Sequence, residues 1–389
     1  MKSIKILYFN SPKYDLITAL HIEGLLKQNH IQIRFTDTGN YAPPDKVLND
    51  SEIIDFANNE AEVIILGSRT RPLNNKIDLF WEINRNKQFF IKMEGGDESA
   101  LDCSISEFFK FDLIFKREIF KTDWSFSSFC NSYIGGEIGL NKKVIAHKSQ
   151  PFTHFHSLAN NLPFPLHIRN ILRNFVFLSN TGKVFPFLMG IEDRFIGQYN
   201  PKPKYMLNCI MRPHSKIRET ILEKLNSNYG NKVYTKPVLP SKHDIEWMRE
   251  RGAFSNDYYQ SQKIKDFNSL GIGSAQNLKY LDLLNDSRAT IAIPGGGFDT
   301  LRAWEALAQG SLLIAKKSTL VTPKRLIEGK HYLSFDNLDQ LFEIIEWVFN
   351  NTDIVDAIRK KGQEYALKYH NSQARAENFL KIIDSIIKK

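Results

Sequence analysis

The chain has 389 residues, of which 42% are hydrophobic, and its 52 basic side chains exceed its 43 acidic ones to give a formal net charge of +9. This composition is typical of a soluble globular protein and excludes the disordered, collagen-like and disulfide-rich classes. At typical domain sizes of ~100–200 residues, a chain of this length favours two domains, each with its own core.

The cysteines and the N-terminus indicate where the protein resides. Cys103, Cys130 and Cys209 are odd in number and widely spaced, which argues against a disulfide framework or a thiolate metal site and favours a reducing compartment. Lys5 and Pro12 interrupt the N-terminal apolar run too early for a signal peptide. No stretch reaches the ~18–20 apolar residues of a membrane span. We therefore expect a cytoplasmic protein.

The excess positive charge is divided among small clusters instead of one basic arm. These are Lys142-Lys143, Lys316-Lys317, Arg359-Lys360-Lys361 and Lys388-Lys389. Such dispersal predicts a solvated surface, and the secondary interpretation is a peripheral contact with phosphate groups or with the anionic inner face of a membrane.

The first half of the chain alternates β-rich runs with amphipathic stretches, as in parallel sheets covered by helices. A helix is expected within residues 15–28, where apolar side chains follow helical spacing. The expected strands are Ile4–Phe9, Ile31–Phe35, Val63–Leu66, Phe89–Met93 and Leu113–Phe115. Prolines divide residues 141–190 into short pieces, and no element is assigned there.

Residues 197–204 carry two prolines and no apolar periodicity, which predicts a linker. After it the alternation starts again, with expected strands Tyr205–Ile210, 232–235 and Ala289–Ile293 and expected helices at 215–226, 276–285, 338–349, 353–368 and 372–387. We predict an α/β protein with two Rossmann-like lobes, 1–196 and 204–370, with a cleft between them. The segment 371–389 is expected to form a helix that packs back onto the first lobe.

The most informative motif is Ile291-Ala-Ile-Pro-Gly-Gly-Gly-Phe-Asp-Thr-Leu-Arg-Ala-Trp-Glu305, in which a strand and a glycine run precede a helix capped by Asp299 or Thr300. Glycines allow a close ligand approach, and the helix start offers N–H groups to a phosphate. Arg302 can supply a forked cation, and Glu305 can accept hydrogen bonds from a diol such as ribose.

Simpler interpretations of this motif remain open. Arg302 and Glu305 have the spacing of a surface ion pair, and the glycines could merely turn the chain. Neither common glycine signature fits, because no Gly-Lys-Ser/Thr follows and the glycines lie far from the first strand–helix–strand unit.

Residues 204–388 resemble the nucleotide-sugar domain of GT-B glycosyltransferases, most closely the spore-coat CgeB-like and exostosin-like branch. The resemblance rests on a basic turn, Met211-Arg-Pro-His-Ser-Lys-Ile-Arg218, and on the helix motif Arg302-Ala-Trp-Glu-Ala-Leu307 before Gly310. The segment Glu328-Gly-Lys-His-Tyr-Leu and the final helix with Arg375 also look like that branch.

The N-terminal half resembles the same enzymes in three segments. They are Glu94-Gly-Gly-Asp-Glu98, Phe115-Lys-Arg-Glu118 and Phe185-Pro-Phe-Leu-Met-Gly-Ile-Glu192. One position departs from the pattern, because many retaining relatives carry a glutamate eight residues before the helix glutamate, where this chain has Gly297. The resemblance therefore favours an inverting enzyme.

The resemblance implies an acceptor-binding first lobe and a second lobe that binds a nucleotide-sugar, with UDP- or GDP-sugars most expected. The expected donor residues are Arg212, Arg218, Gly295, Gly296, Gly297, Phe298, Asp299, Thr300, Arg302 and Glu305. Cations and N–H donors should converge on the leaving diphosphate. Further candidates near the site are Lys116, Arg117 and His214.

An inverting displacement needs a base for the acceptor hydroxyl, and the candidates after the fourth strand are Glu94, Asp97 and Glu98. For each of them a solvated acidic turn is the alternative. His147 is a minor alternative for the base.

No cofactor or metal is expected. The chain has no Asp-x-Asp pair of the kind that holds a divalent ion in another glycosyltransferase fold, and His154-x-His156 lacks a third ligand in register.

The predicted function is transfer of a sugar from a nucleotide donor to a saccharide, lipid-linked or other hydroxyl acceptor in surface polysaccharide, lipopolysaccharide or glycoconjugate synthesis. A nonenzymatic sugar-phosphate or nucleic-acid binding protein is the alternative, although dispersed charge disfavours nucleic acid. A nucleotide-sugar epimerase or hydrolase on the same scaffold is a further alternative. Product analysis separates these, because only transfer creates a glycosidic bond.

Overall fold

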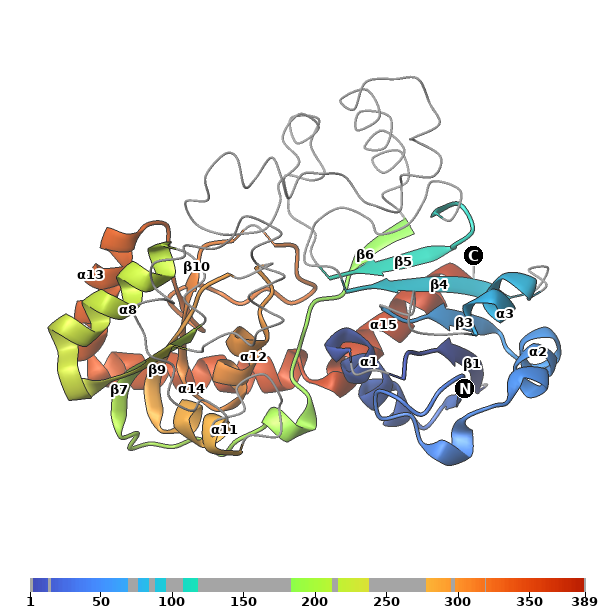
Figure 1. Ribbon diagram of the computed structural model, residues 1–389, viewed down its shortest axis with the longest axis horizontal. Helices are drawn as coiled ribbons and strands as arrows, with labels where there is room; N and C mark the ends of the chain where they lie inside the picture. The colour runs from blue at the N-terminus through green and yellow to red at the C-terminus, as the bar shows by residue number, and fades with distance from the viewer. Residues whose placement is uncertain are drawn as a thin grey trace, which may run out of the picture.

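The structure is a computed structural model that describes residues 3–12, 15–68, 76–83, 88–95, 108–117, 183–211, 216–237, 278–294, 298–318 and 320–387. These residues form two parallel β-sheets with helices packed against them (Figure 1). The two sheets are separate, with six and five strands, so the sequence-based expectation of two Rossmann-like lobes is confirmed.

The N-terminal lobe has strand order β2-β1-β3-β4-β5-β6. Its strands are β1 (Ile4–Phe9), β2 (Ile31–Phe35), β3 (Val63–Leu66), β4 (Phe89–Glu94), β5 (Leu113–Lys116) and β6 (Val184–Pro186). Its helices are α1 (Leu16–Leu26), α2 (Asp50–Asn59) and α3 (Ile77–Glu82), with a 3-10 turn, η1, at Pro44–Lys46. The sequence did not predict α2, α3 or β6.

The C-terminal lobe has strand order β11-β10-β9-β7-β8. Its strands are β7 (Tyr205–Met211), β8 (Val233–Pro237), β9 (Ser287–Ala292), β10 (Leu312–Lys316) and β11 (Leu333–Phe335). Its helices are α8 (Lys216–Tyr229), α11 (Leu278–Asn285), α12 (Leu301–Ala308), α13 (Leu338–Asn350) and α14 (Thr352–Tyr369), with a 3-10 turn, η6, at Gly230–Lys232. Strands β10 and β11 were not predicted.

Each sheet separates two hydrophobic cores because successive side chains of a strand point to opposite faces. In β1, Ile6 and Tyr8 belong to one core, whereas Leu7 and Phe9 belong to the other. All four side chains are fully buried. Strands covered on both faces have continuous apolar runs, which is why the sequence predicted several of them with their observed bounds.

The last helix, α15 (Ser372–Ile387), leaves the second lobe and packs against α1 of the first, as expected from the sequence (Figure 1). Phe379 and Ile383 are fully buried in the core that contains Ile6 and Tyr8. Gly24 of α1 allows this close approach, because a Cβ atom there would collide with the backbone of Ser372. The C-terminal segment therefore completes the N-terminal core.

Within the described residues, the chain passes between the lobes twice. We use the term crossover for residues 187–204, which lead from β6 to β7 and include a 3-10 turn, η5, at Asp193–Phe195. The second passage is the α14–α15 junction. The two passages are joined by backbone hydrogen bonds from Ile191 N to His370 O (2.8 Å) and from Ser372 N to Ile191 O (2.9 Å).

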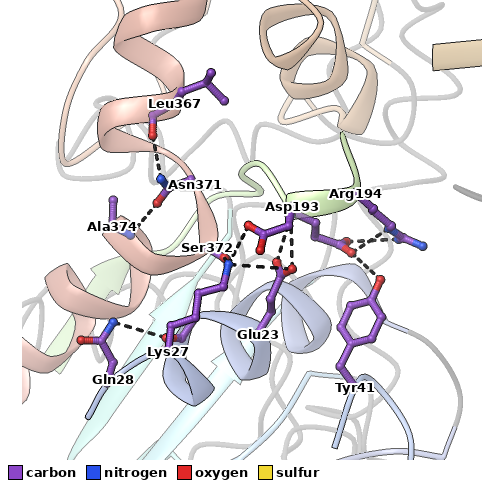
Figure 2. Close-up of polar contacts among 12 residues, drawn as sticks. Glu23, Lys27, Gln28, Tyr41, Asp193, Arg194, Leu367, Asn371, Ser372 and Ala374 are labelled. Carbon is purple, nitrogen blue, oxygen red and sulfur yellow. Dashed lines mark hydrogen bonds and ion pairs between the residues drawn. The ribbon is translucent and has the colours of Figure 1, made fainter. Parts of the chain in front are cut away.

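Side chains reinforce this junction from the N-terminal lobe (Figure 2). Lys27 Nζ, at the end of α1, lies 2.6 Å from Asp193 Oδ1 and 2.7 Å from Ser372 Oγ. Glu23 accepts a hydrogen bond from the backbone N–H of Asp193 at 3.2 Å. The crossover and α15 are therefore both attached to α1.

One expectation about surface charge is wrong. Arg359, in a basic cluster predicted to be solvated, is fully buried on α14. It donates hydrogen bonds to Gly310 O (2.7 Å) and Asn200 O (2.7 Å) and pairs with Asp356 Oδ1 at 3.1 Å. This guanidinium thus binds the turn after α12 to the crossover.

None of the described helices is both long enough and apolar enough to cross a membrane.

Candidate functional site

The order of the second sheet places a candidate site between β7 and β9. Strand β8 lies on one side of β7 and β9 on the other, so the connections after β7 and β9 diverge. Ligands of open parallel sheets bind at the carboxyl ends of strands where the order switches in this way. The basic turn follows β7 and the glycine run follows β9, so the two motifs flank this point.

Helix α12 begins directly after the glycine run. Thr300 occupies the position before the first turn, as expected, but its side chain makes no capping hydrogen bond. Phe298 is half-buried. The glycine residues at 295–297 lie outside the described residues, as do Arg212 and His214 after β7. The described part of the site therefore consists of the end of β9, residues 298–300 and α12.

Glu305 is buried on α12, with 5% of its surface exposed. Its Oε2 atom accepts a hydrogen bond from the hydroxyl of Tyr280 on α11 at 2.9 Å. Burial raises the pKa of Glu305 to about 7, although the hydrogen bond from Tyr280 and the charge of Arg302 oppose the shift. A surface ion pair between Arg302 and Glu305 is excluded because the carboxylate is not on the surface.

Arg302 and Arg218 approach the same strand end. Burial raises the pKa of Cys209 on β7 to about 12, and the positive charges of these two arginines oppose that shift. Arg302 is half-buried, and its Nε atom makes no hydrogen bond within the described part of the chain. The positive charges of the sequence-predicted cations Arg218 and Arg302 thus both act on Cys209, in the second half of β7.

Arg218 on α8 is oriented toward the backbone that precedes the glycine run. It is 5% exposed, and one terminal nitrogen donates to Ile293 O (3.1 Å) and Pro294 O (2.6 Å). Its observed contacts therefore hold the end of β9 in place.

Asp299 is also buried, with 3% exposure, on the other side of the glycine run. Its Oδ1 atom accepts from Trp304 Nε1 (2.7 Å), and its Oδ2 atom accepts from the backbone N–H of Met189 (2.5 Å). Arg117 of the N-terminal lobe contacts it through Nε at 3.4 Å and donates a second hydrogen bond to the Asp299 carbonyl oxygen. The carboxylate is therefore occupied by protein donors.

The candidate base Glu94 ends β4 and is 2% exposed. Its oxygens lie 3.1 Å from Lys92 Nζ and 3.8 Å from Lys116 Nζ. This carboxylate is therefore already paired with two ammonium groups of the protein. Asp97 and Glu98 lie outside the described residues, as do His147, His154 and His156.

Gly95, directly after Glu94, lies against the loop that follows β3. A Cβ atom at this position would collide with the Ser68 hydroxyl and would lie 3.3 Å from Ile17. The backbone can approach this closely only because residue 95 is glycine. Gly95 O also accepts a hydrogen bond from Arg117 at 3.3 Å.

A second polar cluster joins the crossover to the first lobe. Glu192 is fully buried and contacts Arg194 Nε at 2.8 Å, while the Tyr41 hydroxyl donates to Glu192 Oε2 at 2.8 Å. Figure 2 labels Tyr41 and Arg194 of this cluster. Asn40 and Tyr41 both have left-handed backbones, with φ of 60° and 69°. For a bulky residue such as tyrosine this conformation is an outlier. The charges of Glu192 and Arg194 also act on the pKa of Glu305, in opposite directions.

The sequence analysis missed Tyr280, Trp304 and Met189 as contributors to the site. Trp304 lies inside the helix motif, five residues after Asp299, and this spacing was the available signal that its indole N–H donates to the Asp299 carboxylate. Tyr280 and the Met189 backbone carry no sequence signal that relates them to α12.

Within the described ranges, no group of three or more His, Cys, Asp or Glu side chains is arranged to hold a metal ion.

Residues 218–381 match the sequence profile of a family described as glycosyl transferase-like. The matched residues cover β9, the start of α12 and most of the C-terminal lobe, which contain the described part of the candidate site. A sequence search of curated proteins found no significant match.

Solved structures resemble the whole chain. The glycosyltransferase from Rickettsia africae ESF-5 has 11% sequence identity, a TM-score of 0.56 and 100% coverage of both chains. Anabaena HepE in complex with UDP and glucose has 10% identity and a TM-score of 0.54, over 98% of this chain and 100% of that chain. HepE in complex with UDP-glucose gives a TM-score of 0.51 at 10% identity, with the same coverage of 98% and 100%.

These similarities establish the fold, and the GT-B class predicted from the sequence is confirmed. The narrower prediction of a CgeB-like or exostosin-like branch stays a prediction, as do the proposed domain limits.

Proposed function

We propose that the protein is a glycosyltransferase that moves a sugar from a nucleoside-diphosphate donor to a hydroxyl acceptor. The observation that carries the proposal is the convergence of Arg302 and the buried Glu305 on one helix start, at the switch point of the second sheet of a GT-B fold. The glycosyl transferase-like match covers the same helix, and Anabaena HepE, which shares the fold, binds UDP and glucose.

In the proposed donor site, the backbone of residues 295–300 and Arg302 bind the diphosphate, and Glu305 binds the ribose. Arg212 and His214 would add contacts from the turn after β7. Helix N-termini attract phosphate groups through their free N–H groups and the helix dipole. Since the Glu305 hydrogen bond to Tyr280 occupies one oxygen, ribose binding would use the other oxygen or exchange this partner.

In the proposed reaction, an acceptor oxygen forms a bond to the anomeric carbon while the bond from that carbon to the phosphate oxygen breaks. The acceptor proton passes to a base, and the electron pair leaves with the nucleoside diphosphate. Asp97 and Glu98 are the preferred bases, because Glu94 is already paired with two lysines. Gly297 in place of the glutamate of many retaining relatives favours inversion.

The same proposal includes catalysis without a metal, because Arg302 and backbone N–H groups can stabilise the leaving diphosphate. It also includes a saccharide or lipid-linked acceptor and a peripheral contact with an anionic membrane, motivated by the net charge of +9. UDP- and GDP-sugars are the preferred donors.

The test is titration calorimetry with UDP, GDP, ADP and CMP in EDTA, followed by product analysis with the sugar of the nucleotide that binds. At about pH 8, above the Glu305 pKa of about 7, Glu305→Ala should weaken nucleotide binding by about 1.5–3 kcal/mol, because the ribose loses a charged acceptor. Arg302→Ala should also lower turnover, since charge on the leaving group grows in the transition state.

Substitutions at two exposed residues provide matched controls. The variants Glu343→Ala, on α13, and Arg325→Ala should both bind nucleotide like the wild type. Unchanged affinity in both site variants would contradict the donor site. Loss of wild-type binding in EDTA would contradict metal independence. If the protein converted a nucleotide-sugar but formed no glycosidic bond with any acceptor, the result would favour the epimerase or hydrolase alternative.

A further inference from the structure

The two ends of the glycine run are held by buried side chains of opposite charge. Before it, Arg218 donates to the carbonyl oxygens of Ile293 and Pro294. After it, the Asp299 carboxylate accepts from Trp304 and from the backbone of Met189. The sequence placed Arg218 and Asp299 among the donor-binding residues, and in the structure their side chains also support the backbone on either side of the glycine run.

Asp299 is also poorly suited to contact a diphosphate through its side chain. Two negatively charged groups repel each other, and the repulsion is strong in a water-poor site. The Asp299 side chain is 2% exposed, and its carboxylate faces the guanidinium group of Arg117. Burial lowers the pKa of Arg375 on α15 to about 10, and the negative charge of Asp299 opposes this shift, which places a second cation near the carboxylate.

Arg117 connects Asp299, which supports the end of the glycine run, to the N-terminal lobe. It follows β5, is 4% exposed, and contacts Asp299 by its Nε atom and one terminal nitrogen. Its other terminal nitrogen donates to Gly95 O at 3.3 Å. Gly95 lies in the acidic loop 94–98, which carries the candidate bases.

We propose that Arg117 is a positioning residue that fixes Gly95, directly after β4 of the first lobe, against Asp299, just before the start of α12 in the second. In the proposed function the base follows Gly95 and the donor diphosphate binds next to Asp299, so a loss of this contact would misalign the two reacting groups. This inference rests on the proposed function, and it assigns Arg117 no contact with substrate.

Reactions between bound groups depend steeply on such separations, and a displacement of about 1 Å can lower the rate by about 10²-fold. Arg117→Ala and Arg117→Lys should therefore lower the kcat of donor hydrolysis by roughly 10²-fold. The affinity for the nucleotide product and the KM for the donor should stay at wild-type values, because the donor loop remains supported by Arg218 and Trp304.

The experiment measures the hydrolysis of UDP-glucose and GDP-mannose and the binding of UDP and GDP by calorimetry. Arg117→Lys retains a cation for the buried carboxylate, so a folded variant is available if Arg117→Ala unfolds. Asp299→Asn breaks the same pair from the other side with little change of shape. The double variant Arg117→Lys/Asp299→Asn should lose no more kcat than Asp299→Asn alone, because both substitutions break the same ion pair.

Lys27→Ala is the matched control. It removes another ion pair between the N-terminal lobe and the crossover, remote in sequence from both loops, and should keep the wild-type kcat. Wild-type kcat in Arg117→Lys and Asp299→Asn would overturn the proposal. A parallel loss of nucleotide affinity and kcat would also overturn it, because it would indicate a donor ligand or a general fold defect. A wild-type protein that binds neither nucleotide and hydrolyses neither donor would contradict the proposed function itself, and with it this inference.

Discussion

Two ion pairs connect the N-terminal lobe to the rest of the chain in contrasting surroundings. Arg117 and Asp299 meet at 3.4 Å with 5% and 2% of their side chains exposed. Lys27 and Asp193 meet at the shorter distance of 2.6 Å, but 29% and 57% of their side chains are exposed. The first pair lies at the candidate donor loop, and the second lies at the crossover (Figure 2).

Distance alone would rank the exposed pair as the stronger one. Water and salt screen exposed charges, however, and most such pairs contribute little to stability. In a buried pair each charge has lost its hydration and depends on its partner, so removal of one partner leaves the other uncompensated. Burial, and not the atom-to-atom distance, therefore decides how much the fold depends on a contact.

The largest effect is expected from Asp299→Ala. The substitution leaves Arg117 near an empty position and removes the acceptor of two further hydrogen bonds. We expect the free energy of unfolding to fall by about 3–5 kcal/mol, as for other broken buried pairs. Urea denaturation followed by circular dichroism measures the change. A loss below about 1 kcal/mol, the range of exposed pairs, would remove the distinction between the two pairs.

Glu305 is a buried carboxylate without a full counter-charge, so its ionisation should destabilise the folded protein, in contrast to the paired charge of Asp299. The pKa of Glu305 is about 7 in the folded protein and 4.5 in the unfolded chain. Below about pH 4.5 both states are protonated, and as pH rises toward 7 only the unfolded state ionises, so stability is lost. The loss, complete above about pH 7, corresponds to roughly 3 kcal/mol at about 1.4 kcal/mol per pKa unit.

Glu305→Gln removes this titration and provides the reference. The difference in unfolding free energy between the variant and the wild type should therefore shift in favour of the variant between pH 4.5 and pH 7. Urea denaturation across this range tests it. A difference that does not vary with pH would mean that Glu305 ionises normally in the folded protein.

The indole of Trp304 tests one hydrogen bond within the buried network. Trp304→Phe removes the donor to Asp299 Oδ1 while most of the aromatic packing stays. A hydrogen bond to a charged group is worth about 1.5–3 kcal/mol, and the unfolding free energy should fall by that amount. Trp347→Phe, at an indole that is 36% exposed on α13, is the matched control and should change stability little. Equal effects of the two substitutions would show that the bond to Asp299 contributes nothing.

Much of the fold was predictable because buried parallel strands have continuous apolar runs. Ile4–Phe9, Ile31–Phe35 and Val63–Leu66 were predicted with their observed bounds. Helix α2 was missed although Asn49 and Glu52 form a capping box at its start. Its remaining apolar positions are too few to give a clear periodic pattern.

The site was predictable where its residues are close in sequence. The strand end, the helix start, Arg302 and Glu305 belong to one short motif with local physical signals. The pairing of Arg117 with Asp299 was not predictable, because the two residues are 182 positions apart and meet only when both lobes have folded. The contacts of Arg218 and Asp299 with the protein were not predictable for the same reason, since their sequence neighbours do not reveal which groups they face.

The smallest effect is expected from Lys27→Ala. The variant loses the contacts of the Lys27 ammonium group with Asp193 and Ser372, but the hydrogen bond from the Asp193 backbone to Glu23 remains. The unfolding free energy should fall by about 0.2–1 kcal/mol. Burial raises the pKa of Glu23 and the charge of Lys27 lowers it, so the variant should raise that pKa further. Because the pair is exposed, its contribution should shrink between about 0.1 M and about 1 M salt, where the screening length falls from ~10 Å to ~3 Å. Urea denaturation at both salt concentrations measures this, and a loss as large as that of Asp299→Ala would show that exposure does not separate the two pairs.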